Sequence, residues 1–247
     1  TLVAGAEALG FSFWDPRPAA ARDFRNADTI EVARHPAIAG EVWRRVAPHV
    51  RAEGDIRIAS EADRRGERGT LGTWAPCGVN ENLLLSRYRS GGHFAPHTDG
   101  YSVENFNTRT MLSAILYLND CAEGGGTRFY DDAAAGALTK DASGRVTGDP
   151  GHVIATVAPK AGRMLCFYHN HVHEGVPPGP GDEKFIIRTD LMYERTPRIC
   201  DAPADREAFA LFTEAERLAG NQREAEALEL FKRAVKLSPA LAAIYGM

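Results

Sequence analysis

The sequence predicts a mainly β fold, in which a two-sheet jelly roll of short antiparallel strands is flanked by helices. Three observations lead to this prediction. Residues 81–193 consist of short apolar or alternating runs separated by turns, and no long helical pattern interrupts them. Eight such runs are present, which is the number of strands in a jelly roll. The regions before and after carry apolar residues at helical spacing.

The eight expected strands follow one another at short intervals. The longest gap between them, residues 133–151, is polar and glycine-rich and is expected to be a surface loop. The expected strands are residues 83–89, 94–97, 110–118, 127–130, 152–157, 164–168, 172–174 and 184–193.

The first 50 residues are predicted to be a helical support for this core. Residues 4–9 form helices readily, and Gly10 stops the run. Residues 36–47 place apolar side chains at helical spacing, and Pro48 is expected to close that helix. The next segment, residues 51–78, is charged and then glycine-rich. It is expected to be a solvated loop or hairpin and is a candidate lid.

A change of character after Pro197 predicts a separate helical hairpin. Residues 204–219 and 223–236 indicate two helices broken at Gly220 and Asn221. Small and aromatic residues of the second helix resemble the spacing of a tetratricopeptide helix pair. One such pair cannot bury its own apolar face. The pair therefore packs on the preceding domain, contacts a protein partner, or begins a repeat array.

Composition excludes several classes of function. A chain of 247 residues with 44% hydrophobic and 25% charged residues is typical of a globular protein. The net charge of −4 gives no general attraction to nucleic acid, and no apolar run is long enough to cross a bilayer. We therefore expect a soluble intracellular protein, in the cytoplasm, that needs neither nucleic acid nor membrane. The chain starts at Thr1, so a removed targeting segment is the alternative.

The cysteines form no metal-binding or redox pair. They are far apart in the sequence, and a core of this size does not need disulfides. We expect four reduced thiols, at Cys77, Cys121, Cys166 and Cys200.

A possible metal site begins with His97 and Asp99. Side chains two residues apart on a strand point to the same face, so this pair can converge on one ion. A third ligand must come from elsewhere, and His169, His171 and His173 occupy alternate positions that one strand could present together. Two histidines and one carboxylate on one face of an octahedron are the ligands of non-heme Fe(II) oxygenases.

Two cations follow these histidines. Lys184 and Arg188 are four residues apart on the last expected strand and therefore share a face. Together with a metal, they would suit a small dicarboxylate. The alternative is that one of them pairs with a nearby acid such as Asp190.

Taken together, these motifs resemble the prolyl 4-hydroxylase-like branch of the Fe(II)/2-oxoglutarate-dependent dioxygenases. The resemblance covers most of residues 1–195. One departure is Gly126, where that branch usually carries glutamate. The motifs are Arg87-Tyr88-x-x-Gly91-x-x-Phe94-x-x-His97-x-Asp99-Gly100, Leu116-Tyr117-Leu118-Asn119, Gly124-Gly125-x-Thr127-x-Phe129, His173-Glu174-Gly175 and Lys184-x-x-x-Arg188.

The resemblance implies a double-stranded β-helix and a complete cofactor set. Fe(II) would be held by His97, Asp99 and His173, and the presence of the carboxylate implies hydroxylation or a related oxidation, and not halogenation. The cosubstrates would be 2-oxoglutarate and O2, with ascorbate as an accessory. Lys184, or its rival Arg188, would pair with the distal carboxylate of 2-oxoglutarate.

The resemblance also gives roles to two tyrosines. The Tyr117 hydroxyl would bond the same distal carboxylate, and Tyr88 would line the pocket. Both are equally suited to be core aromatics.

These implications lead to a working hypothesis with alternatives. Residues 1–200 are expected to be the dioxygenase domain, with its jelly-roll core at residues 80–195, and residues 201–247 the helical hairpin. The expected activity is hydroxylation of prolyl residues in a peptide or protein. The alternatives are a hydroxylase of a free amino acid or another metabolite, a cupin-like isomerase or hydrolase, and an inactive jelly roll that recruits a partner through residues 203–247.

Overall fold

The computed structural model describes residues 1–15, 22–60, 62–63, 65, 69–131 and 138–245. The chain forms two compact units, each built from separate stretches of sequence. The first unit comprises Thr1–Arg45, Gly78–Tyr101 and Met111–Leu191, and the second comprises Val46–Cys77, Ser102–Thr110 and Met192–Met247.

All eight strands expected from the sequence are present, which confirms the mainly β class. Two of them have the predicted bounds, and the others differ by one to three residues at an end. They are β6 (Leu83–Tyr88), β7 (His93–His97), β9 (Thr108–Tyr117), β10 (Thr127–Tyr130), β13 (Val153–Val157), β14 (Met164–Tyr168), β15 (His173–Gly175) and β16 (Lys184–Thr196).

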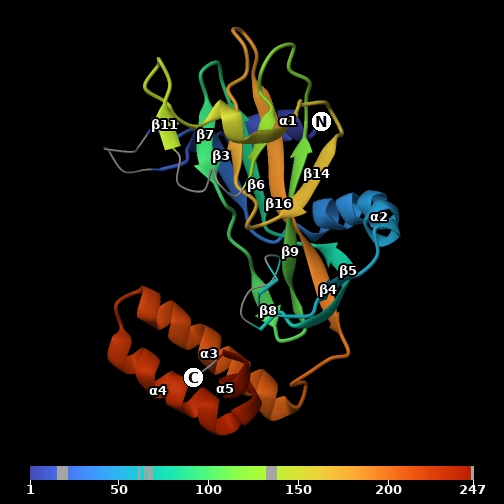
Figure 1. Cartoon of the computed structure of the whole chain (residues 1–247), viewed down its shortest axis with the longest axis vertical. Coiled ribbons are helices and arrows are strands. Elements are labelled where there is room, and N and C mark those ends of the chain that lie inside the picture. The colour runs from blue at the N-terminus through green and yellow to red at the C-terminus, as the bar shows by residue number, and fades with distance from the viewer. Residues whose placement is uncertain (16–21, 61, 64, 66–68, 132–137, 246–247) are drawn as a thin grey trace. The chain divides into compact units, whose positions relative to one another are not determined.

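Apart from one short hairpin, the strands described in the first unit belong to two antiparallel sheets (Figure 1). The smaller sheet has the order β13-β10-β15-β7-β2, with β2 (Arg25–Asn26) at its edge. The larger sheet includes β1 (Ser12–Phe13), β3 (Asp28–Val32), β6 and β16, and β9 joins β16 to β14.

A shared apolar core shows that the two sheets face each other. Tyr117 and Phe167 of the larger sheet pack in one buried cluster with Phe129 of the smaller sheet. Complete burial of one such aromatic side chain contributes about 2–3 kcal/mol. This arrangement of two packed sheets confirms the predicted jelly roll.

The first 50 residues are not helical throughout. The helix α1 (Leu2–Leu9) ends at Gly10 as predicted, but β1, β2 and β3 then follow. The reason is tertiary: β3 pairs with the buried strand β6, with Ile30 opposite Leu85, and this pairing outweighs local preference.

The helix α2 (Pro36–Ala52) begins at the predicted proline but does not stop at Pro48. A proline inside a helix removes one backbone hydrogen bond. Val50 lies two residues further along and is buried, so packing of the last turn offsets this loss.

The expected loop at residues 133–151 contains regular structure, which corrects the prediction. Strands β11 (Leu138–Lys140) and β12 (Val146–Gly148) form a hairpin, and a 3-10 turn at Pro150–His152 follows. The hairpin turn is closed by Asp141, whose Oδ1 accepts hydrogen bonds from the backbone N–H groups of Ser143 and Arg145. Strands of three residues are too short to give a periodic signal. Residues 132–137 lie outside the described residues.

In the second unit, β4 (Ile56–Ile58) and β5 (Gly72–Val79) form an antiparallel pair. The hairpin alternative for the charged segment is therefore confirmed. Part of the segment, at residues 61, 64 and 66–68, lies outside the described residues. Its role as a lid stays a prediction.

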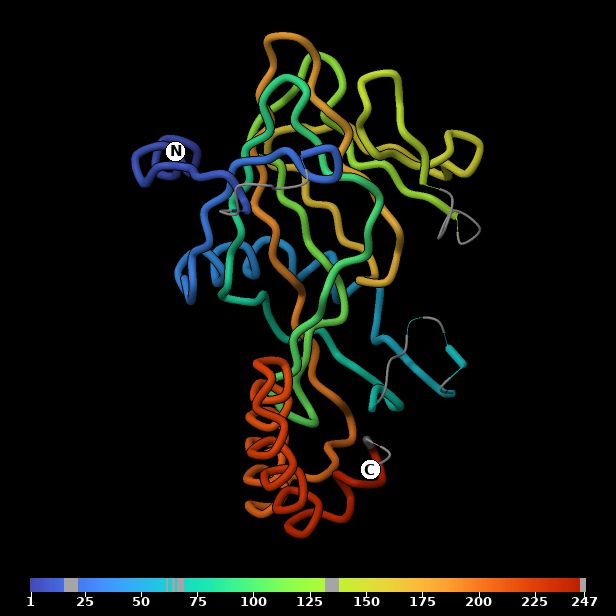
Figure 2. Tube along the Cα trace, turned by 90° about the vertical axis from the view of Figure 1, so that its left-hand side faces the viewer, coloured from blue at the N-terminus to red at the C-terminus, as the bar shows by residue number. Residues whose placement is uncertain are grey.

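The C-terminal helices are α3 (Pro203–Gly220) and α4 (Glu224–Leu237), which lie side by side (Figures 1 and 2), with the expected break after Gly220. A third helix, α5 (Pro239–Tyr245), was not predicted. It completes the pair, because Leu241 is fully buried against Phe209 and Phe212 of α3. Phe106, next to β8 (Val103–Asn105), packs in the same cluster.

Two further expectations concern the whole chain. All four cysteines are free thiols. Among the described residues, no helix combines the length and apolar character that crossing a membrane requires.

Candidate metal centre

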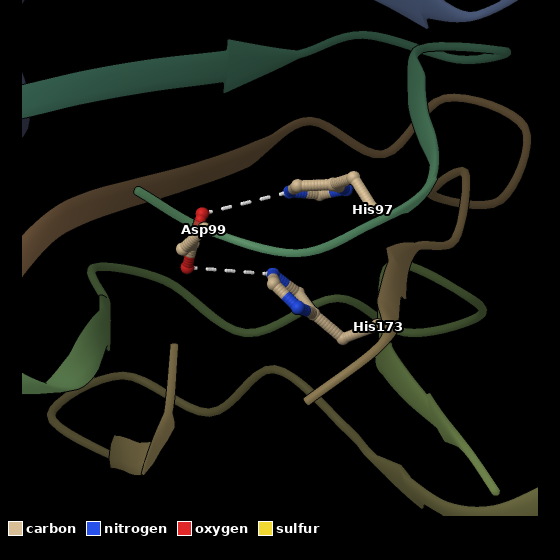
Figure 3. A group of neighbouring side chains, drawn as sticks. All are labelled: His97, Asp99 and His173. Carbon is tan, nitrogen blue, oxygen red and sulfur yellow. Dashed lines mark ion pairs between the residues drawn. The ribbon is translucent and has the colours of Figure 1, made fainter. Parts of the chain in front are cut away.

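Three side chains from β7, β15 and the segment after β7 meet in the first unit. His97 ends β7, and His173 begins β15 directly opposite it in the antiparallel ladder. Asp99 lies beside the two rings and turns one oxygen toward each (Figure 3), with Oδ1 3.7 Å from His97 Nε2 and Oδ2 3.6 Å from His173 Nε2. One ligand atom from each residue falls within 4.8 Å of the others, so the three atoms can surround a single ion.

Both imidazoles have the orientation that a metal ion requires. His97 Nδ1 lies 2.8 Å from the Ala95 carbonyl oxygen, and His173 Nδ1 lies 3.0 Å from that of His171. These carbonyls only accept, so each Nδ1 carries the proton and each Nε2 presents a lone pair. A backbone carbonyl that fixes the tautomer in this way is a common partner of metal-binding histidine.

The electrostatics keep the two rings neutral. Burial, together with the nearby His173, lowers the pKa of His97 to about 3, and burial also lowers the pKa of His173. Burial raises the pKa of Asp99, but the neighbouring His173 ring, the positive charge of Arg188 and a hydrogen bond from Ser113 outweigh it and hold the pKa below its usual value. Two neutral imidazoles and one carboxylate are the forms that bind a divalent cation.

The structure brings together the three residues that the sequence singled out, but for reasons that differ in part from those of the sequence argument. Asp99 lies beyond the end of β7, so it shares no strand face with His97. His169 and His171 lie in the turn between β14 and β15, so one strand does not present all three histidines. Of the three, only His173 lies with His97 and Asp99.

A second group of side chains holds Asp99. Ser113, on β9, donates a hydrogen bond of 2.6 Å to Asp99 Oδ2, and its hydroxyl lies 2.9 Å from His169 Nδ1. The Asp99 backbone N–H donates to the His169 carbonyl at 2.9 Å. No motif in the sequence singled out Ser113, because its partners come from a loop and a turn that are distant in the chain.

Arg188 is part of this group and does not lie beside Lys184. Its guanidinium is 3.1 Å from Asp190 Oδ1 and 3.6 Å from Asp99 Oδ1, and it donates to the Gly100 carbonyl. Burial raises the pKa of Asp190 to about 6, although the charge of Arg188 opposes this. Arg188 therefore pairs with the local acid that the sequence offered as the alternative.

Lys184 occupies a different environment on the same strand. It is 2% exposed, and its Nζ lies 4.3 Å from the centre of the Tyr88 ring, which is its cross-strand neighbour on β6. No carboxylate in the described part of the chain pairs with this ammonium group. Burial lowers the pKa of Lys184 to about 8. A buried cation without an acidic partner is a binding element for an anionic ligand.

Tyr117 and Tyr88 both belong to the buried core cluster. The Tyr117 hydroxyl lies 2.6 Å from Thr127 Oγ1 and donates to the Val157 carbonyl at 3.3 Å. Tyr88 faces Lys184, so the two suggested pocket tyrosines lie on the inner face of the larger sheet.

Comparison with known proteins agrees with this site. Residues 83–189 match the model of the 2OG-Fe(II) oxygenase superfamily, where 2OG is 2-oxoglutarate. The matched segment includes His97, Asp99 and His173, so the resemblance found in the sequence is confirmed there. A comparison with curated proteins gave no match.

Several solved structures are similar in arrangement. A Pseudomonas putida prolyl-4-hydroxylase has 18% identity and a TM-score of 0.43, over 78% of this chain and 84% of that one. The viral collagen prolyl hydroxylase of Paramecium Bursaria Chlorella virus-1 has 15% identity and a TM-score of 0.44, over 78% and 87%. HygX from Streptomyces hygroscopicus, solved with nickel, 2-oxoglutarate and hygromycin B, has 12% identity and a TM-score of 0.42, over 79% and 78%.

Proposed function

We propose that the protein is a 2-oxoglutarate-dependent hydroxylase that uses Fe(II) held by His97, Asp99 and His173. The observation that carries this proposal is the pair of free Nε2 atoms on either side of one carboxylate. The donor set fits Fe(II), because three protein ligands leave positions open for a cosubstrate and O2. When bound, Fe(II) supplies the activation of O2 that hydroxylation of a C–H bond needs.

In this proposal, the other residues around the site bind the cosubstrate or orient the ligands of the metal. Lys184 attracts the distal carboxylate of 2-oxoglutarate, because it is a buried cation with no acidic partner of its own among the described residues. Tyr88 lies beside that ammonium group and shapes its surroundings. Arg188 is already compensated by Asp190, so its role is to hold Asp99 and not to bind the cosubstrate.

The apolar cluster next to the site has a separate role. Phe167 lies edge-on to the His173 ring, with 4.5 Å between ring centres, and Phe94 stacks on the His97 ring at 3.6 Å. These rings fix both imidazoles and exclude water from their faces. Exclusion of water protects a reactive oxidant from side reactions.

For the substrate, we propose a prolyl residue or a free amino acid related to it. The resemblance to prolyl 4-hydroxylases favours the first, and nothing in the described loops encodes recognition of a peptide. The alternative of a partner-recruiting domain without activity is weakened by the intact donor set.

Turnover of 2-oxoglutarate tests the proposed activity. The protein is supplied with Fe(II), 2-oxoglutarate, O2 and ascorbate, and succinate formation is measured together with a mass gain of one oxygen in candidate peptides and amino acids. Asp99→Ala should abolish succinate formation while the circular dichroism spectrum stays native. Full turnover in this folded variant would refute the proposal.

A further inference from the structure

Beside the metal-binding residues lies a second cation that the proposed activity does not use. Arg25 belongs to β2, the edge strand of the smaller sheet, and its cross-strand neighbour is Phe94. The guanidinium carbon lies 4.5 Å from the centre of the Phe94 ring, and that ring stacks on the His97 imidazole. Arg25 is therefore separated from the proposed metal ligand by a single ring.

The direction of Arg25 follows from its strand. Phe94, its cross-strand partner and therefore on the same face of the sheet, packs against the core cluster that contains Tyr88. The guanidinium therefore lies next to the region between the proposed metal site and Tyr88.

Two aromatic rings contact this cation, and no acid pairs with it among the described residues. Trp14 lies beneath the guanidinium at 5.1 Å, and its indole N–H donates to the Arg25 carbonyl at 2.8 Å. Arg25 Nε is buried and donates no hydrogen bond, and no ion pair to Arg25 is formed within the described part of the chain. The side chain is partly exposed, but its buried Nε lacks a hydrogen-bond partner, and a carboxylate ligand would satisfy it.

Charge balance indicates what kind of ligand this is. The dication and Asp99 leave one positive charge, and Lys184 adds another. The dianion of 2-oxoglutarate cancels both. Arg188 is balanced by Asp190 at 3.1 Å. Arg25 remains as the one uncompensated charge of this set once the cosubstrate is bound.

We propose that Arg25 is the specificity-determining residue for a carboxylate of the substrate, which rests on the proposed function above. The substrate class is then a small carboxylic acid, such as a free amino acid, or a peptide whose C-terminal carboxylate lies next to the hydroxylated residue. Arginine suits this role because its planar fork binds a carboxylate through two parallel hydrogen bonds. An internal prolyl residue of a peptide offers no such group.

The first arm of the test separates substrate from cosubstrate. Without oxygen, 2-oxoglutarate is titrated into the Fe(II)-loaded protein, and the visible charge-transfer band of the chelate is followed. The dissociation constant should stay within twofold of wild type in Arg25→Gln, whereas it should rise about tenfold or more in Lys184→Gln. A tenfold rise in Arg25→Gln would overturn the proposal and assign Arg25 to the cosubstrate. Absence of the band in the wild-type protein would instead reject the proposed function itself.

The second arm uses matched acids and amides. Succinate formation is measured with the twenty free L-amino acids and their carboxamides, and with Gly-Pro and its amide. At least one acid should stimulate turnover about tenfold more than its amide. That gain should disappear in Arg25→Gln and return in part in Arg25→Lys.

A nearby arginine provides the control for this arm. Arg22→Gln removes an exposed arginine that lies over Phe13 and bonds Asn26, and it should leave the stimulation unchanged. The proposal is overturned if no acid stimulates succinate formation more than its amide does. It is overturned in the same way if none of the compounds stimulates succinate formation. A preference that survives in Arg25→Gln would overturn it equally.

Discussion

His97 and His173 are cross-strand partners in an antiparallel ladder, and their rings lie 4.3 Å apart between centres. Because β7 and β15 are neighbours, the two imidazoles come from strands that hydrogen bonding fixes relative to each other. Only Asp99, beyond the end of β7, needs separate support. The rigidity of the proposed metal site therefore depends on what holds this carboxylate.

Ser113 provides that support, and its removal should weaken metal binding. Ser113→Ala deletes the 2.6 Å hydrogen bond to Asp99 Oδ2 and leaves His169 Nδ1 without its hydroxyl partner. Loss of a residue that orients a ligand typically costs about 10–100-fold in metal affinity. Calorimetric titration with Mn(II), a redox-stable substitute for Fe(II), measures this loss.

Ser113→Thr serves as the control for this prediction, because it keeps the hydroxyl and should restore most of the affinity. If Ser113→Ala binds Mn(II) as tightly as the wild-type protein, Ser113 has no positioning role.

The binding of 2-oxoglutarate should weaken at alkaline pH. Burial lowers the pKa of Lys184 from 10.5 to about 8, and the protonated form is the one that attracts a carboxylate. Affinity should therefore be constant below about pH 8 and fall about tenfold per pH unit above it. The measurement is the dissociation constant of 2-oxoglutarate between pH 7 and pH 9.5.

Two substitutions identify Lys184 as the source of this pH dependence. Lys184→Met should bind weakly at every pH, and Lys160→Met, which removes an exposed lysine, should keep the wild-type profile. An unchanged profile in Lys184→Met would contradict the assignment.

The three consecutive glycines before β10 should differ in their tolerance of alanine. Gly124 has a φ of 65°, and an added Cβ would lie 2.4 Å from the Pro177 carbonyl oxygen. Gly124→Ala should therefore destabilise the protein by about 1–3 kcal/mol. At Gly126 the closest atom to an added Cβ is Thr156 Cγ2 at 3.0 Å, and a side-chain methyl can yield, so Gly126→Ala should cost less than about 1 kcal/mol.

Urea denaturation of both variants measures this difference. The result also bears on the site, because Gly125 and Gly126 exchange backbone hydrogen bonds with Pro177 and Val176, just after His173 and β15. Equal destabilisation by the two substitutions would show that this backbone contact does not constrain the turn.

The sequence predicted those features that depend on residues close together in the chain. The strands β10 and β14 have their predicted bounds because each is a short run that contains aromatic, strand-forming residues and lies between turns. His97, Asp99 and His173 were found because their neighbours match a family at the right spacing. The family match over residues 83–189 agrees with that recognition.

What the sequence could not show depends on contacts between distant residues. The hairpin of β11 and β12 is held by Val146, whose N–H donates to the Asp23 carbonyl, and no periodicity predicts that contact. The sequence also could not show that Lys184 and Arg188 have different partners. Both lie on β16, but one meets Tyr88 and the other Asp99 and Asp190, and only the folded sheets determine these partners.

The central claim is that His97, Asp99 and His173 bind Fe(II) and admit 2-oxoglutarate beside it. The most direct test is to add Fe(II) and then 2-oxoglutarate to the metal-free protein without oxygen and to record the visible spectrum. We predict a metal-to-ligand charge-transfer band that is lost in His173→Ala and retained in His171→Ala. A well-folded protein that never develops this band, or a His173→Ala variant that keeps it, would contradict the claim.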